Sequence, residues 1–141
     1  MYNALNYIKI MISVLGGAIA GLFGGCDMIL KALICFVCVD YLTGTVRAIK
    51  ERKLNSRTGF IGLLKKALIF TVVLLAHVLD EVTGICALRS MAVLFYISNE
   101  GISILENLGK LGIPYPQKLK DILEQLEDKD DEDNEDTKSD N

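Results

Sequence analysis

The chain has 141 residues, of which 51% are hydrophobic, and its mean hydropathy is +0.36. This hydropathy is high for a soluble domain of such length and indicates a membrane protein. The formal net charge of −3 conceals a segregation of charge. The last fifteen residues hold nine acids and two lysines, about −7, whereas the other 126 hold thirteen bases and nine acids, about +4. A basic, apolar body therefore precedes an acidic tail.

The first predicted span covers residues 5–25 and is rich in small residues at four-residue spacing. Such ladders let helix backbones approach closely in lipid. They could serve packing within one protomer or self-association. The segment could also lie along the membrane interface instead of crossing it. The small residues of the two interleaved ladders are Ser13, Gly17, Gly21 and Gly25, and Gly16, Ala20 and Gly24.

The second predicted span, residues 28–51, carries polar groups on one side. Charged groups are costly in a bilayer, so they usually face protein, a partner subunit or water. Cys35 and Cys38 lie inside an apolar run; since a zinc or redox site would need a loop and further ligands, we interpret them as small core residues. The polar side consists of Asp40, Thr43, Gly44, Arg47, Lys50 and Glu51.

The third predicted span, residues 59–79, repeats this pattern. Depths follow from a rise of about 1.5 Å per residue. Asp40 then lies about 10 Å inward of Arg47, Lys66 about 10 Å inward of Gly59, and Glu100 about 15 Å inward of Lys110. All three charges share one half of the membrane, so either acid could pair with Lys66. One side of the span holds Lys66, Phe70, Val73, His77, Asp80 and Glu81.

The fourth predicted span, residues 85–108, has a polar stripe about 120° wide at 100° per residue. Apolar residues, Leu105 among them, cover the remainder and are expected to face lipid. Such a helix belongs against a bundle seam or a water-filled hole, and we predict the stripe to be buried or pore-lining. The stripe consists of Arg89, Tyr96, Asn99, Glu100, Ser103, Glu106, Asn107 and Lys110.

Basic residues predict the topology. Residues 47–66 carry seven lysines and arginines against the single acid Glu51, whereas Asp27 and Asp80 lie at the other two turns. The positive-inside rule places the 47–66 region in the cytoplasm. Four spans then place both termini inside. With three spans, the N-terminus would be outside unless the first segment stays on the inner surface.

The C-terminal part is predicted to leave the membrane domain, which we assign to residues 1–111. Pro114 and Pro116 interrupt the helix. Residues 114–127 form a short cytoplasmic amphipathic helix with Leu119, Ile122, Leu123 and Leu126 on one face, which could lie on the inner membrane surface or self-associate. The acidic tail, residues 128–141, is expected to be disordered.

No enzyme constellation is present in the sequence. The single His77 has no nucleophile at convincing spacing, and there is no phosphate loop or set of metal ligands, so no cofactor or metal is expected. The basic 47–66 region is better explained by topology and anionic lipid than by nucleic acid.

Several short motifs follow one another between about Met28 and Leu126. They are Asp40-Tyr-Leu-Thr-Gly44, Ala48-Ile-Lys50, Leu54-Asn-Ser56, Gly59-Phe-Ile-Gly62 with Lys65-Lys66, Phe95-Tyr-Ile-x-Asn-Glu100-Gly-x-Ser-Ile-Leu-Glu-Asn107, and Leu111-Gly-Ile-Pro114-x-Pro116 with Lys118-Leu-Lys120. In this order they resemble the toxin-secretion and phage-lysis holin family.

The resemblance implies a non-enzymatic, multi-pass protein of the bacterial cytoplasmic membrane that forms a homo-oligomer. Its lesions would release an endolysin or a toxin and lyse the host cell, without necessary direct contact with that cargo. Holins often have a second start; here Met11 follows Lys9, so a product starting there would lose one positive charge. Two other functions stay open: a small ion- or proton-coupled transporter using Asp40 or Glu100, and an accessory subunit of a larger membrane complex.

Overall fold

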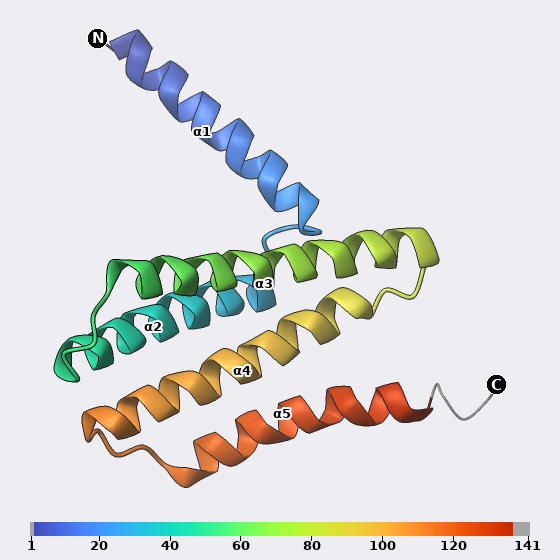
Figure 1. The fold of residues 1–141 in the computed structure, drawn as a ribbon. Helices are drawn as coiled ribbons and strands as arrows, with labels where there is room; N and C mark the ends of the chain where they lie inside the picture. The colour runs from blue at the N-terminus through green and yellow to red at the C-terminus, as the bar shows by residue number, and fades with distance from the viewer. Residues whose placement is uncertain (1, 137–141) are drawn as a thin grey trace.

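The computed structural model describes residues 2–136, and every regular element in that range is a helix (Figure 1). The helices α1, α2 and α3 are long and apolar enough to cross a membrane. The polar stripe keeps α4 below this hydropathy. The all-α, multi-span fold predicted from the sequence is confirmed. The helices are α1 (Tyr2–Leu22), α2 (Met28–Lys50), α3 (Ser56–Thr83), α4 (Leu88–Leu111) and α5 (Gln117–Asp136).

Local sequence signals set the helix ends. The Asp27 carboxylate accepts a hydrogen bond from the Leu30 N–H at 3.0 Å and caps α2, and Asn55 caps α3 in the same manner. Ser, Thr, Asp and Asn are the preferred N-cap residues because their side chains satisfy free backbone donors. Gly84 and Gly112 end α3 and α4 in the left-handed conformation, with φ of 73° and 83°.

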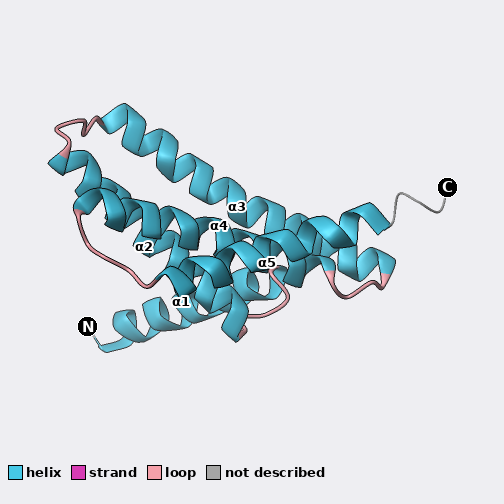
Figure 2. Cartoon of the chain, turned by 90° about the horizontal axis from the view of Figure 1, so that it is seen from below, coloured by secondary structure: helices cyan, strands magenta, loops and turns pink. Residues whose placement is uncertain are grey.

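Three helices, α2, α3 and α4, form the bundle (Figure 2). The central element is α4, which packs most extensively on α2 and also on α3, whereas α2 and α3 touch each other less. Leu33, Val73 and Val93, one from each helix, are fully buried. Burial of such side chains contributes about 1.5–3 kcal/mol each. The buried core cluster comprises Leu30, Leu33, Val37, Ile69, Val73, Val93 and Ile97.

The first helix, α1, projects away from this bundle (Figure 1). Its apolar side chains are exposed, and only its C-terminal end approaches α2 and α3, where the Phe23 and Phe70 rings meet edge to face at 6.3 Å. The helix ends at Leu22 because Gly24 and Gly25 adopt positive φ angles of 75° and 98°. The expectation that both glycines extend the helical ladder is therefore wrong.

The last helix, α5, folds back along α4. It spans Gln117–Asp136, which is longer than the predicted helix of residues 114–127, and disorder of the acidic tail stays a prediction. No proline or glycine interrupts residues 117–136, which hold many Glu, Lys and Gln residues that favour helix. The rest of the predicted disordered tail, residues 137–141, lies outside the described residues.

Two smaller expectations fail at the helix surfaces. Leu105, expected to face lipid, is only 4% exposed, because α5 covers that side of α4. Cys35 and Cys38, interpreted as core residues, are exposed on α2, and their thiols are free. Their side of α2 faces away from the buried core.

Candidate functional site

A charged seam runs between α2, α3 and α4. At its centre, the Lys66 ammonium donates to Asp40 Oδ2 at 2.6 Å and also to Glu100 Oε2. Asp40 is 7% and Glu100 6% exposed. The predicted pairing of Lys66 with one of these acids is confirmed, and Lys66 in fact contacts both. One amino group from α3 thus bridges a carboxylate of α2 and a carboxylate of α4.

Asn107 extends the seam from the other oxygen of Asp40. Its amide nitrogen donates to Asp40 Oδ1 at 3.1 Å and to the Thr43 hydroxyl at 3.2 Å. Its amide oxygen accepts from the Arg47 guanidinium at 2.9 Å. The seam then contains two carboxylates and two cations, a balanced set, and this connection makes it tolerable in a low-dielectric interior.

The end of the bundle beyond Arg47 is held by backbone contacts. Lys50 donates to the carbonyl oxygens of Lys110 and Leu111 at 3.2 and 3.0 Å, which are free acceptors at the C-terminus of α4. A cation there also favours the helix dipole. Gly44 packs in this region, since a Cβ on it would lie 3.5 Å from the Asn107 amide nitrogen.

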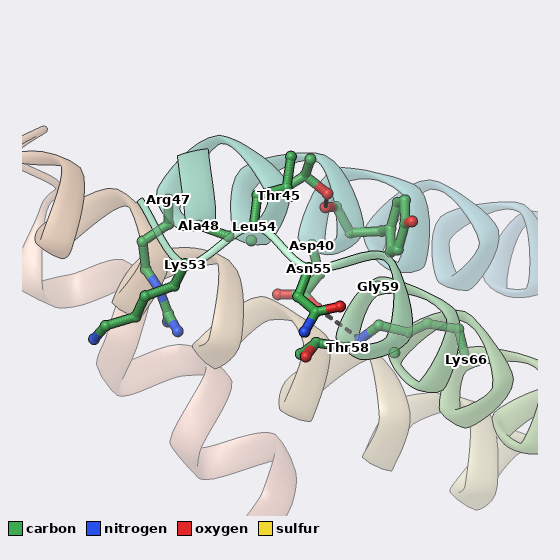
Figure 3. A pocket seen from close by; sticks show the side chains of 13 residues that line it. Asp40, Thr45, Arg47, Ala48, Lys53, Leu54, Asn55, Thr58, Gly59 and Lys66 are labelled. Atoms are coloured by element: carbon green, nitrogen blue, oxygen red, sulfur yellow. Dashed lines mark hydrogen bonds and ion pairs between the residues drawn. The ribbon is translucent and has the colours of Figure 1, made fainter. Parts of the chain in front are cut away.

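A pocket of about 230 Å³ opens beside the seam, between α2 and the start of α3 (Figure 3). It includes Asp40 and Lys66, whose ion pair is drawn in Figure 3, and it extends past Thr58 to the loop around Lys53. A pocket of this size, with the Asp40 and Lys66 groups in its lining, has room for several water molecules. The buried ion pair therefore lies next to a route for water from the basic end of the bundle.

A second polar cluster joins the opposite ends of the helices. The Arg89 guanidinium makes a two-pronged contact with Asp27, at 2.8 and 3.1 Å. The Asp80 carboxylate accepts from the backbone N–H groups of Ala87, Leu88 and Arg89 at 2.8–3.0 Å. Asp80 thus caps α4 from another helix. The Arg89 contact lowers the pKa of Asp27, and the Leu30 N–H lowers that pKa further.

Comparison with known proteins now identifies the family. The model of the Bacteriophage holin family matches residues 17–128. The chain belongs to this family. The match includes both polar clusters and begins within α1, and holins of this family are membrane proteins that are generally not enzymes.

One relative has a name that agrees with this assignment, and two others are similar proteins without a described function. A probable holin of Bacillus phage phi105 is 36% identical over 70% of this chain and 73% of its own length. An uncharacterized 14.9 kDa protein of Clostridium perfringens is 45% identical, covering 89% of this chain and 97% of that protein. The uncharacterized protein YqxH of Bacillus subtilis is 41% identical over 75% and 76% of the two chains. No solved structure matches.

The predicted polar stripe of this holin divides into three groups. Glu100, Asn107 and Arg89 are buried in the clusters described above. The remaining predicted side chains are less buried. Tyr96, Asn99 and Ser103 on α4 and His77 on α3 are half-buried, and Glu106 is exposed. Pore lining by any of these residues stays a prediction, because the buried members satisfy one another within the protomer.

The predicted packing glycines also divide. A Cβ added to Gly16, Gly17 or Gly21 would meet nothing within 4 Å, whereas one on Gly24 would lie 2.9 Å from the His77 ring. Ala20 lines an apolar pocket between α1 and the bundle. Among the described residues, Gly17 and Gly21 of the ladder therefore have open space beside them, whereas Gly16 lies at the edge of the same apolar pocket as Ala20.

Sequence reasoning missed the Asp27–Arg89–Asp80 cluster as a unit. Asp27 and Asp80 entered only as turn or stripe charges. Asp27 directly before an apolar helix is a readable N-cap signal. The capping of α4 by Asp80 is not readable, because it depends on how α3 and α4 meet.

Proposed function

We propose that this holin assembles with copies of itself in the bacterial cytoplasmic membrane and opens lesions through which an endolysin or a toxin leaves the cell. The observation that carries the proposal is a family match over residues 17–128 combined with a buried charged seam between helices that include two candidate spans. An apolar bundle of this kind holds polar side chains that can face water once the helices rearrange.

The described protomer is closed, because Lys66, Asp40 and Glu100 satisfy one another. We propose that assembly turns the polar side of α4 toward a water-filled lesion. Asn99, Ser103 and Glu106 are half-buried or exposed on α4 and are the first groups available for its lining. Water in the lesion would replace the hydrogen bonds that the seam loses, which lipid cannot do.

The glycine ladder of α1 supports assembly of several copies. A Cβ on Gly17 or Gly21 would meet no other residue that the structure describes within 4 Å, and α1 is long and apolar enough to lie in the membrane. Small residues at four-residue spacing allow helices to associate in lipid through close backbone contact. The cargo needs no contact with the holin if it leaves through the lesion.

The proposed orientation places the basic 47–66 region and both termini in the cytoplasm. Lys53 has a 77% exposed side chain in this region and suits a labelling test. A Lys53→Cys variant, in a background without other cysteines, should resist an impermeant maleimide in intact cells before lysis. Labelling from outside at that stage contradicts the orientation.

A proton-coupled transporter is the second candidate, because the pocket beside Lys66 brings water to the buried Asp40 carboxylate. Induced expression with and without a co-expressed endolysin separates the candidates. The proposal expects abrupt growth arrest, and a sharp fall in turbidity only when the endolysin is present. A transporter would leave the cells intact and show gradient-dependent flux, and an accessory subunit expressed alone would be inert.

A further inference from the structure

The amphipathic helix α5 occupies a built seat on the bundle. Leu123 is 6% exposed, whereas its neighbour Ile122 is 47% exposed. Leu123 rests on Gly101 of α4: a Cβ added to Gly101 would lie 2.8 Å from both Leu123 methyl carbons and 3.1 Å from the Phe36 ring of α2. The absence of a side chain on Gly101 thus gives the Leu123 methyl groups room to pack against α4.

The seat is part of an apolar groove of about 240 Å³ between α2 and α4. Phe36 and Val39 come from α2, Ile104 and Leu108 from α4, and Leu119 and Leu123 of α5 lie over them. In this position α5 covers apolar surface of the groove that would otherwise be free to bind another helix.

The docked position of α5 along α4 is unfavourable for its acidic C-terminal half if the bundle lies in the membrane. Lys50 binds the carbonyl oxygens of Lys110 and Leu111, so α4 ends beside the basic end of α2. From there α5 runs back along α4 (Figure 1), and α4 itself packs along the candidate span α2. Residues 127–136 of α5 contain eight acids and one lysine.

These acids cannot accompany α4 into hydrocarbon. A helix of 20 residues is about 30 Å long, which is the thickness of the hydrocarbon core. A docked α5 would carry its acidic half to the depth of the apolar bundle, where ionised carboxylates are strongly disfavoured. An embedded α2–α4 bundle and a fully docked α5 therefore exclude each other.

We propose that α5 is a releasable cover, and that the groove it leaves is filled by α1 of a second copy of this chain. This inference rests on the proposed function. The 112–116 connection, with Gly112 at a φ of 83° and two prolines, is the hinge. α1 is the fitting occupant, because a Cβ on its Gly17 or Gly21 would meet no other described residue within 4 Å, so both positions are open to another copy, and the groove floor is also a glycine.

A reversible lock tests the release. The four natural cysteines are free and exposed; serine replaces Cys26, Cys38 and Cys86, and alanine replaces Cys35, because Cys35 lines the apolar groove. Gly101→Cys with Leu123→Cys then places a thiol pair across the seat. The oxidised, full-length protein in phosphatidylcholine–phosphatidylglycerol vesicles should stay monomeric on crosslinking and release no entrapped dextran, and reductant should restore both oligomers and release. Oxidised protein that oligomerises and releases dextran overturns the inference.

A matched pair tests the direction of the effect without a disulfide. Leu123→Ser should loosen the cover, so crosslinked oligomers rise several-fold and lysis comes earlier than in the wild type, while Ile122→Ser should leave both unchanged. A purely structural α5 predicts later lysis and fewer oligomers for Leu123→Ser, which contradicts release. Oligomers that rise without any crosslink between α1 and the groove contradict α1 as the occupant. If the wild type neither oligomerises nor releases dextran, the proposed function itself fails.

Discussion

The α1 helix and the α2–α4 bundle both have apolar sequences, but they differ in how their side chains make contacts. The bundle places its charges inside, where Lys66, Asp40 and Glu100 join three helices. In contrast, α1 has no charge cluster, and its Gly17 and Gly21 lie beside open space in the part of the chain that the structure describes. Polar pairing depends on direction and fixes one arrangement within a protomer, whereas small residues only permit close approach. We therefore expect the buried charges to fix the fold of the α2–α4 bundle, and α1 to mediate contact between copies of the chain.

The largest expected effect comes from breaking the centre of the seam. Lys66→Met leaves the Asp40 and Glu100 carboxylates buried together without a cation. Loss of one partner from a buried ion pair typically costs about 3–5 kcal/mol. We expect lower protein levels and a clearly lower Tm in detergent. Lys65→Met, at an exposed neighbouring position, is the control and should behave like the wild type. Equal Tm values for both variants would contradict the claim that the charged seam stabilises the bundle.

The next effect concerns α1. Gly21→Leu adds bulk at a position where a Cβ would meet no other described residue of the protomer within 4 Å, so the Tm of the bundle should not change. Close approach of α1 to a helix of another copy should be blocked, and lysis should be delayed or abolished with the protein still inserted. Ala18→Leu, which adds a similar volume off the ladder, is the control. Crosslinking before and after triggering measures assembly, and unchanged oligomers for Gly21→Leu refute the role of the ladder.

Smaller effects are expected from neutralising Glu100. Glu100→Gln keeps a polar partner near Lys66, which retains Asp40, so the protein should fold and lyse at a shifted time. Glu100→Leu should shift the time further, because it dries the polar side of α4. Leu105 cannot serve as the lipid-side control, since α5 covers it. Leu94→Ala, at a 36% exposed position, replaces it and should matter least. If all three variants have identical lysis times, the polar stripe of α4 serves packing within the protomer and does not line the lesion.

The smallest effect is a pH dependence at the Asp27–Arg89 contact. Because Arg89 lowers the pKa of Asp27 in the folded state, the contact stabilises the fold above the ordinary carboxyl pKa of 3.8. This stabilisation is lost as the pH falls below about 4, through the folded-state pKa. The Asp27 side chain is 43% exposed, so the effect is modest. Asp27→Asn keeps the helix cap, and its Tm should fall less than that of the wild type between pH 6 and 3.

Much of the architecture was readable from the sequence. Hydrophobic runs and glycine or proline breaks gave the five helices, and the 1.5 Å rise per residue brought Lys66 to the depth of Asp40 and Glu100. Contacts set by helix packing were not readable. Asp80 caps α4 only because α3 and α4 meet at that angle, and Leu105 is buried only because α5 folds back. Periodicity finds the faces of a helix, but it does not name the partner of each face.

Intermolecular crosslinking during lysis tests the central comparison most directly. Cysteine replaces Gly17, on the α1 ladder, or Leu75, which is 57% exposed on the outside of α3, in a chain that keeps Cys35 of the groove and has serine at the other three natural cysteines. Each variant is expressed with an endolysin and treated with a short thiol crosslinker while turbidity is followed. The account predicts that crosslinked oligomers form through position 17 as turbidity falls, and that position 75 gives few or none. Lysis with crosslinks through position 75 and none through position 17 would contradict it.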